Sequence, residues 1–162
     1  MYAGFNLITN DDFIAFRNNG NTIYNNKKRI IEEELKKFLL NDGSLDGTEM
    51  QNSWFPQINA DIFLSHSHND KEKAIALAGW INATFGLTVF IDSCVWGSAD
   101  ALLRIIDDEY CKNVDSPTYS YEKRNFSTSH VYMMLSSALT MMIDKTECVI
   151  FLKHQTRWMH QK

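Results

Sequence analysis

The chain has 162 residues, of which 44% are hydrophobic and 22% charged, so it can build one ordinary hydrophobic core. Sixteen Lys and Arg against twenty Asp and Glu give a net charge of −4 without a long block of either sign. This pattern argues against nucleic acid or a membrane surface as a partner. The apolar runs stop well before the roughly 20 residues of a membrane span, and no signal segment follows Met1. We therefore expect a cytoplasmic protein.

The cysteine pattern points to the same compartment. The three cysteines are odd in number, widely spaced and contain no CxxC pair; they are Cys94, Cys111 and Cys148. This arrangement argues against a disulfide scaffold and against a zinc site, and it fits a reducing environment. We expect no metal and no bound cofactor.

The first third of the chain has helical patterns only. Residues 1–26 are rich in Asn and contain one short helical pattern, at 11–18. Residues 27–40 place their apolar side chains on one stripe of a helix, which Asn41, Asp42 and Gly43 terminate. Residues 43–57 are a turn-rich connector. We expect residues 1–58 to be an N-terminal helical extension and connector.

The rest of the chain alternates strands and helices. The apolar runs at 60–64 and 87–91 are strand patterns, and residues 71–84 between them have helical spacing. Strand, helix and strand in this order predict a right-handed βαβ unit with parallel strands buried on both faces. Helices at 99–110 and 127–144 and a strand at 148–152 follow. The predicted class is α/β, with residues 59–162 as one domain.

Two short motifs end the first two predicted strands and suggest a family. The first is Leu64-Ser65-His66-Ser67 and the second is Phe90-Ile91-Asp92. Their order and separation resemble the Toll/interleukin-1 receptor (TIR) domain, in particular the bacterial TIR-like proteins found among anti-phage defence genes. The resemblance covers residues 60–153. It implies a three-layer, flavodoxin-like fold with a parallel sheet that is incomplete at its C-terminus, because the family has five strands.

The resemblance also implies a function. TIR enzymes hydrolyse or cyclise NAD by breaking the bond between nicotinamide and ribose, with a glutamate that lies four residues beyond a tryptophan. Trp158 is the candidate tryptophan, and the residue four positions later is Lys162. We therefore expect a chain related to NAD-cleaving enzymes of antiviral signalling that is itself inactive or a fragment of such an enzyme. The alternative is a non-catalytic TIR-type interaction module. The partners implied are an NAD-like nucleotide, as possible substrate, and a second copy through TIR–TIR contacts.

The polar residues at the C-terminal ends of the predicted strands are the candidate site residues. Because parallel strands share a direction, their polar C-terminal ends lie at one edge of the sheet, where α/β proteins bind ligands. The expected substrate-binding residues are Ser65, His66, Ser67, His68, Asp92 and Trp96. The catalytic residue stays unknown, since no glutamate stands at the expected position.

Each of these residues also has a structural interpretation. Ser67 and its neighbours up to residue 70 fit the N-cap region of the following helix equally well. Asp92 can cap the turn that follows it, and Trp96 can cover the sheet edge. Ser65, His66 and Asp92 together contain the side chains of a hydrolase triad, but the Gly-x-Ser-x-Gly elbow is absent. His66 and His68 lack a third metal ligand at a fixed spacing.

The predicted sheet also has a weak point. With three strands, residues 148–152 or the neighbouring strand lie at an unpaired apolar edge. Such an edge is a template for association, so we expect poor stability or self-association.

Overall fold

The computed structural model of the chain describes residues 3–25, 35–114 and 116–153. The described residues form two compact units, and each is discontinuous in sequence. Unit 1 consists of residues 1–28, 58–94 and 142–162, and unit 2 consists of residues 29–57 and 95–141. The division of the chain at residue 58 stays a prediction. Among the described residues, no helix combines the length and the apolar composition needed to cross a bilayer.

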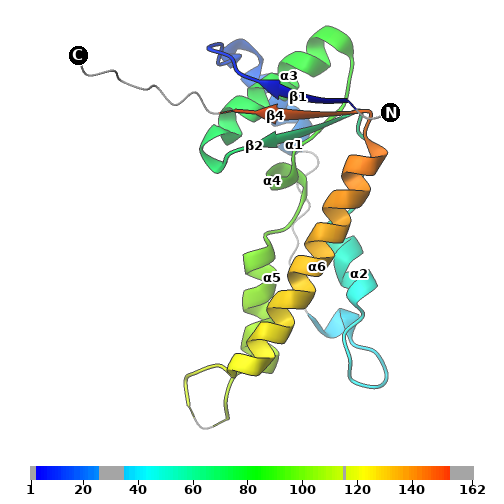
Figure 1. The fold of residues 1–162 in the computed structure, drawn as a ribbon, viewed down its shortest axis with the longest axis vertical. Coiled ribbons are helices and arrows are strands. Elements are labelled where there is room, and N and C mark those ends of the chain that lie inside the picture. Colours follow the sequence, from blue (N-terminus) through cyan, green and yellow to red (C-terminus); the bar gives the residue numbers. More distant parts are fainter. Residues whose placement is uncertain (1–2, 26–34, 115, 154–162) are drawn as a thin grey trace, which may run out of the picture. The chain divides into compact units, whose positions relative to one another are not determined.

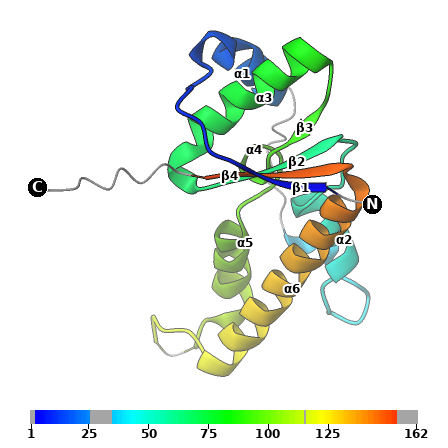
Figure 2. The ribbon, with the colours of Figure 1, turned by 45° about the horizontal axis from the view of Figure 1, so that its top comes forward.

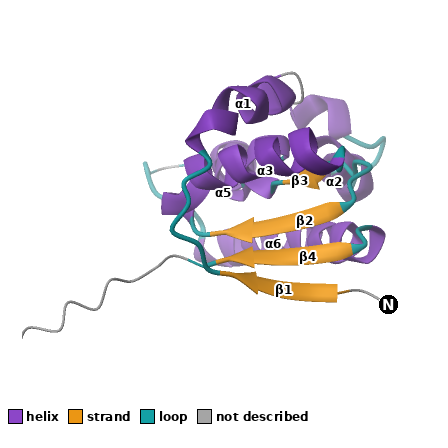
Figure 3. Cartoon of the chain, turned by 90° about the horizontal axis from the view of Figure 1, so that it is seen from above, coloured by secondary structure: helices purple, strands orange, loops and turns teal. Residues whose placement is uncertain are grey.

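Unit 1 is an α/β unit around a four-stranded parallel sheet, which confirms the predicted class (Figure 1). The strands are β1 (Ala3–Leu7), β2 (Ile62–His66), β3 (Val89–Phe90) and β4 (Cys148–Leu152). Their order across the sheet is β1-β4-β2-β3. Figure 3 shows β1, β4 and β2 side by side, with α3 (Lys71–Phe85) and then α1 (Arg17–Asn25) beyond β2.

Strand β1 was not expected from the sequence. Its residues, AGFNL, contain Gly and Asn, which are poor strand formers, and they lack an alternating apolar pattern. The strand forms because it pairs in parallel with β4 along its whole length, from Ala3 opposite Cys148 to Leu7 opposite Leu152. The sequence predicted an N-terminal helical extension and a sheet of three strands, so β1 is a fourth strand that was not predicted. Residues 148–152 are also not an edge, since β4 is paired on both sides.

The predicted βαβ unit is confirmed. Helix α3 spans residues 71–85 between two parallel strands and ends at Gly86, whose φ of 70° is the left-handed conformation that glycine adopts readily. Strand β3 is shorter than predicted because Asp92 already begins the short helix α4 (Asp92–Val95). Both faces of β2 are buried, as Phe63 and Leu64 show.

The helix predicted at 11–18 begins later in the structure. Asp11 and Asp12 accept hydrogen bonds from the amides of Phe13 and Ile14, and Phe13 has a left-handed φ of 52°. These local bonds compete with a helix at that point. A 3₁₀ turn, η1 (Ile14–Phe16), and then α1 follow.

Helix α1 packs closely on α3 through two glycines. A Cβ atom at Gly20 would lie 2.1 Å from the carbonyl oxygen of Ile75, and one at Gly79 would lie 2.4 Å from that of Phe16. The hydroxyl of Tyr24, in the last turn of α1, donates to the carbonyl of Val89 in β3 at 2.9 Å. These contacts compensate for the weak helix propensity of the Asn-rich α1.

Unit 2 is helical. It contains η2 (Leu35–Phe38), α2 (Gly47–Trp54), α5 (Ala99–Ile106), the π-helical turn η4 (Asp107–Cys111) and most of α6 (Tyr121–Lys145). Figure 2 shows α2, α5 and α6 of this unit. Helices predicted at 99–110 and 127–144 are confirmed with shifted ends. Of the helix predicted at 27–40, residues 27–34 lie outside the described residues, and the remainder contains η2.

Helix α2 replaces part of the expected connector. Asp46 caps it, since its carboxylate accepts hydrogen bonds from the amides of Thr48 and Glu49 at 2.9 and 3.1 Å. Asp46 followed three residues later by Glu49 is a helix-start signal that the sequence already carried. Trp54 and Phe55, at the end of α2, are buried in one apolar cluster with residues of α5 and α6, such as Leu102 and Val131.

Candidate functional site

Polar side chains from two neighbouring strand ends meet at the carboxyl edge of the sheet in unit 1. The pairing of β2 with β3 places His66, the last residue of β2, beside Ser93 in the first turn of α4. The Nε2 atom of His66 lies 3.3 Å from the hydroxyl oxygen of Ser93. We call His66, Ser93 and their neighbours Asp92 and Lys71 the strand-end cluster.

One ring nitrogen of the His66 imidazole makes no hydrogen bond within the described part of the chain. Its Nδ1 atom is buried and has no hydrogen-bond partner among the described residues. A buried polar atom without a partner is costly, and sites that bind ligands are one place where such atoms occur. In a catalytic Ser-His pair this nitrogen would donate to a carboxylate, which is not the case here.

The triad suggested by the sequence is not assembled in the described residues. Ser65 and His66 are successive residues of a strand, so their side chains point to opposite faces of the sheet. The carboxylate of Asp92 accepts a hydrogen bond from the amide of Ser93 at 2.6 Å. His66 therefore faces a serine that the sequence reading did not single out.

Ser67 and His68 lie beyond the strand, in and before the 3₁₀ turn η3 (His68–Asp70). The hydroxyl of Ser67 donates to the carboxylate of Asp70, which is itself buried, and the amide of Asp70 donates to the carbonyl of Ser67. These bonds hold the turn before α3, but neither Ser67 at the start of η3 nor Asp70 at the start of α3 makes a side-chain capping hydrogen bond, so the N-cap interpretation stays a prediction. Both Ser67 and His68 are exposed.

Asp92 is the first residue of α4. It is half-buried, and it begins α4 directly after Ile91. Its carboxylate accepts a hydrogen bond from the amide of Ser93, the residue whose hydroxyl faces His66. Whether Asp92 also contacts a ligand stays a prediction.

Two lysines from the first turn of α3 complete this edge, and the sequence reading missed both. The ammonium group of Lys71 donates to the carbonyl of Ser93 at 3.1 Å, and that of Lys73 donates to the carbonyl of Thr9 at 2.6 Å. Thr9 follows β1, so the two lysines reach segments that follow two different strands. The signal was available: a helix that begins directly after a strand presents its first turn at the carboxyl edge of the sheet.

The thiol of Cys94 lies next to this cluster in the chain. Burial raises its pKa above the ordinary value, although the positive charge of Lys71 acts in the opposite direction. A thiol with a raised pKa is a poor nucleophile at neutral pH because little thiolate is present. The buried thiol of Cys94 is thus not activated by its surroundings.

Trp96 belongs to unit 2, unlike the other expected site residues. Its indole N–H donates to the carbonyl of Pro56 at 2.9 Å, and its ring meets that of Phe55 edge-on, with 5.6 Å between the centroids. These contacts are packing within unit 2, and neither the predicted stacking on a ligand nor the predicted cover of the sheet edge is tested by them. Within the described part of the chain, no three His, Cys, Asp or Glu side chains are grouped so as to hold a metal ion.

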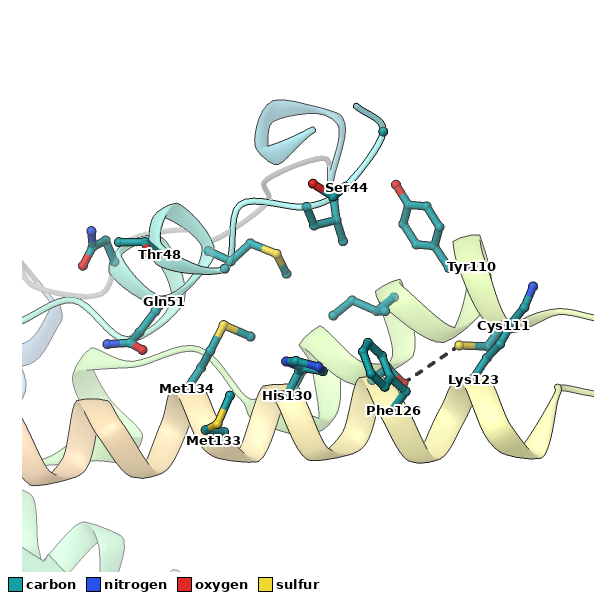
Figure 4. Close-up of a pocket in the computed structure, with 18 of the residues that line it drawn as sticks. Ser44, Thr48, Gln51, Tyr110, Cys111, Lys123, Phe126, His130, Met133 and Met134 are labelled. Carbon is teal, nitrogen blue, oxygen red and sulfur yellow. Dashed lines mark hydrogen bonds between the residues drawn. The ribbon is translucent and has the colours of Figure 1, made fainter. Parts of the chain in front are cut away.

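Unit 2 contains an open groove of about 1050 Å³ between α6 and residues 43–52 (Figure 4). Its lining is largely apolar, and four of the lining residues are methionines, namely Met50, Met133, Met134 and Met141. Figure 4 shows Phe126, His130 and Met134 of α6 facing Thr48 and Gln51 of α2 across this groove.

Comparisons with family models, curated proteins and solved structures found no match to this chain.

Proposed function

We propose that unit 1 is a TIR-like domain that binds an NAD-type nucleotide at the strand-end cluster without cleaving it. The observation that carries this proposal is the contact between His66 and Ser93, which come from the ends of two neighbouring parallel strands. The order β3-β2-β4, with the first strand of the βαβ unit in the middle, supports a flavodoxin-like topology. The three free cysteines fit a cytoplasmic location.

The chemistry of the cluster suits a nucleotide. Lys71 supplies a positive charge for a diphosphate, while the exposed hydroxyl of Ser93, which the Nε2 atom of His66 holds in place, can bond a ribose hydroxyl. Cleavage needs a carboxylate that stabilises a cationic ribosyl centre. The nearby carboxylates of Asp70, Glu72 and Asp92 are engaged with Ser67, Arg17 and the Ser93 amide. Lys162, at the position implied for the family's glutamate, lies outside the described residues.

Calorimetric titration with NAD tests binding, and chromatography of nicotinamide tests cleavage. We expect a measurable affinity for the wild type and no nicotinamide above background. Loss of one hydrogen bond in Ser93→Ala or His66→Ala should weaken binding about three- to tenfold. Ser129→Ala is the matched control, because its hydroxyl bonds only the Asn125 carbonyl of its own helix. Absence of NAD binding by the wild type would refute the proposal.

The variant Asp92→Ala tests whether Asp92 positions Ser93 for NAD binding or only stabilises the fold. We expect it to weaken NAD binding, because the amide of Ser93 loses its acceptor, more than it lowers the melting temperature. An equal loss of both would make Asp92 a structural cap alone.

The second candidate function, a non-catalytic interaction module, is favoured by strand β1. It is an outer strand of the sheet, its residues 3–6 are exposed, and the Phe5 side chain is 56% exposed. An exposed edge strand can pair with another chain. Asn6→Pro removes a backbone donor in β1, so it should abolish association through this edge while NAD binding persists.

A further inference from the structure

We propose that a second copy of this chain docks on helix α6, with the two α6 helices antiparallel about a two-fold axis between Met133 and Met134. This interaction surface is separate from the strand-end cluster and from the β1 edge. The argument uses the exposure of α6, its charge pattern and the groove beside it.

Helix α6 has an exposed face that carries almost no charge. Residues 125–143 contain no Asp, Glu, Lys or Arg. Several apolar side chains on this stretch are nevertheless exposed, with Phe126 at 69%, Met133 at 59% and Met141 at 49%. These residues also line the groove beside α2 (Figure 4). Exposed helix faces usually carry charges, and depletion of charge is the compositional mark of an interface core.

The lack of charge on this face of α6 limits the kinds of partner surface that can bind it. A partner that placed a charged side chain in this groove away from Glu122 and Lys123, which line one end of it, would bury that charge without a counterion, which is strongly unfavourable. The partner must therefore present an equally uncharged surface about five turns long. The same face of α6 on a second copy meets this requirement, and a two-fold axis lets each α6 occupy the groove of the other.

The charges at the two ends of α6 select the antiparallel arrangement. Glu122 and Lys123 lie in its first turn, and Asp144 and Lys145 in its last. About an axis between Met133 and Met134, Lys123 lies opposite Asp144 of the second copy, and Glu122 lies opposite Lys145. Both pairs are attractive. In a parallel pair each of these residues would instead meet its own like charge.

The side chains between the ends also match. In the same alignment Phe126 lies opposite Met141 of the second copy, and Met133 opposite Met134. Sulfur beside an aromatic ring is a favourable contact, and flexible methionines adapt to a helix that enters the groove. Phe126, Met133 and Met141 follow one another at helical spacing on a single stripe, so all can engage at once.

Sedimentation of the full chain at several concentrations tests association. We expect the mass to rise from 18.8 kDa towards twice that value. Met133→Glu places two like charges at the axis and should abolish the dimer, while Met133 is exposed enough for the fold to tolerate the change. A far-UV melt checks the fold of each variant. A mass of 18.8 kDa at every concentration overturns the proposal and leaves the groove to another partner.

Exchanging the charges at the two ends of α6 tests the antiparallel orientation of the two helices. Lys123→Asp and Asp144→Lys should each weaken the dimer about tenfold, because two attractive pairs become repulsive. The double variant should restore wild-type affinity. Both single changes suit the dipole of α6, so a loss of affinity does not reflect a loss of helix. Failure of the double variant to recover overturns the antiparallel arrangement.

Disulfide trapping locates the axis. Met133→Cys should cross-link readily under oxidation, because the two copies of this position lie within one residue of each other along the helices. Thr140→Cys is the control, since its two copies would be about 20 Å apart along the direction of the α6 helices. Equal cross-linking of the two variants overturns the proposed register. A dimer that Asn6→Pro abolishes and Met133→Glu leaves intact assigns association to β1 and also overturns this proposal.

Discussion

In unit 1 the tertiary structure depends on backbone contacts, whereas in unit 2 it depends on side chains. The strands of unit 1 are joined by parallel backbone ladders, and α1 meets α3 through glycines that leave no room for a side chain. Unit 2 has no sheet in its described residues, and large side chains such as Trp54 and Phe55 hold its helices together. The sheet fixes where polar groups emerge, and the helical unit leaves a groove open.

The largest expected effect is that of Gly79→Ala in unit 1. A Cβ atom 2.4 Å from the Phe16 carbonyl oxygen forces α1 away from α3, so we expect a loss of about 3 kcal/mol in the free energy of unfolding. Gly47→Ala is the matched control, because it is also helical but has open space around it. Urea unfolding measures both. Equal stability of the two variants would contradict the close packing of α1 against α3 at Gly79.

The corresponding change in unit 2 is Asp107→Ala. The buried carboxylate of Asp107 accepts hydrogen bonds from the Ser127 hydroxyl at 2.9 Å and from Arg124 Nε at 2.8 Å. Its removal leaves the buried Ser127 hydroxyl without this acceptor, and we expect a loss of about 2 kcal/mol. The half-exposed Arg124 contributes little of this. Asp108→Ala, an exposed neighbour, should have little effect in the same urea titration.

Thiol alkylation separates the effects of these two variants. Burial raises the pKa values of Cys94 in unit 1 and Cys111 in unit 2, so both should react slowly at neutral pH. Gly79→Ala should accelerate alkylation of Cys94, and Asp107→Ala that of Cys111, as followed by mass spectrometry. Acceleration of both thiols by either change would indicate that the two units unfold together.

A smaller effect is expected from the helix cap in unit 2. Asp46→Ala removes the acceptor for two amides at the start of α2 and should lower stability by about 1 kcal/mol. Asn52→Ala, on the same helix and exposed, should leave stability unchanged or slightly higher. Thermal melts followed by circular dichroism compare them. An Asp46→Ala melt like that of Asn52→Ala would show that α2 does not depend on its cap.

The smallest effect concerns the pH dependence of the exposed Asp108. The hydrogen bond from the Tyr119 hydroxyl, at 2.6 Å, and that from Lys112 lower its pKa below the ordinary value. A lowered folded-state pKa stabilises the fold above the ordinary pKa, and this contribution disappears as the pH falls through the folded-state value. In Tyr119→Phe, NMR titration should give Asp108 a higher pKa. An unchanged value would mean that the hydrogen bond is not formed in solution.

The sequence predicted much of unit 1 and less of unit 2. The strands at 60–64 and 148–152 and the helix at 71–84 were recognisable because their apolar patterns are continuous or helical. Strand β1 was not, because its stability comes from the ladder with β4 and not from its own residues. Helix α2 had a recognisable start at Asp46, but its short length and two glycines nearby resembled a connector.

The candidate site was predicted in part for the same reason. Parallel strands and their polar ends can be read from the sequence, so His66 and Asp92 were recognised. Ser93, the partner of His66, was not recognised, because which hydroxyl faces His66 depends on where β3 ends and α4 begins. A shift of one residue in a strand reverses the direction of its side chains.

By itself the sequence determined the α/β class, the βαβ unit and the uncharged stretch of α6, because each depends on the local order of apolar and charged residues. Only the tertiary structure decided that β1 pairs with β4, that His66 faces Ser93, and that α2 stands beside α6 with a groove between them. These features join residues far apart in the chain, so they depend on backbone pairing and packing that no local pattern records.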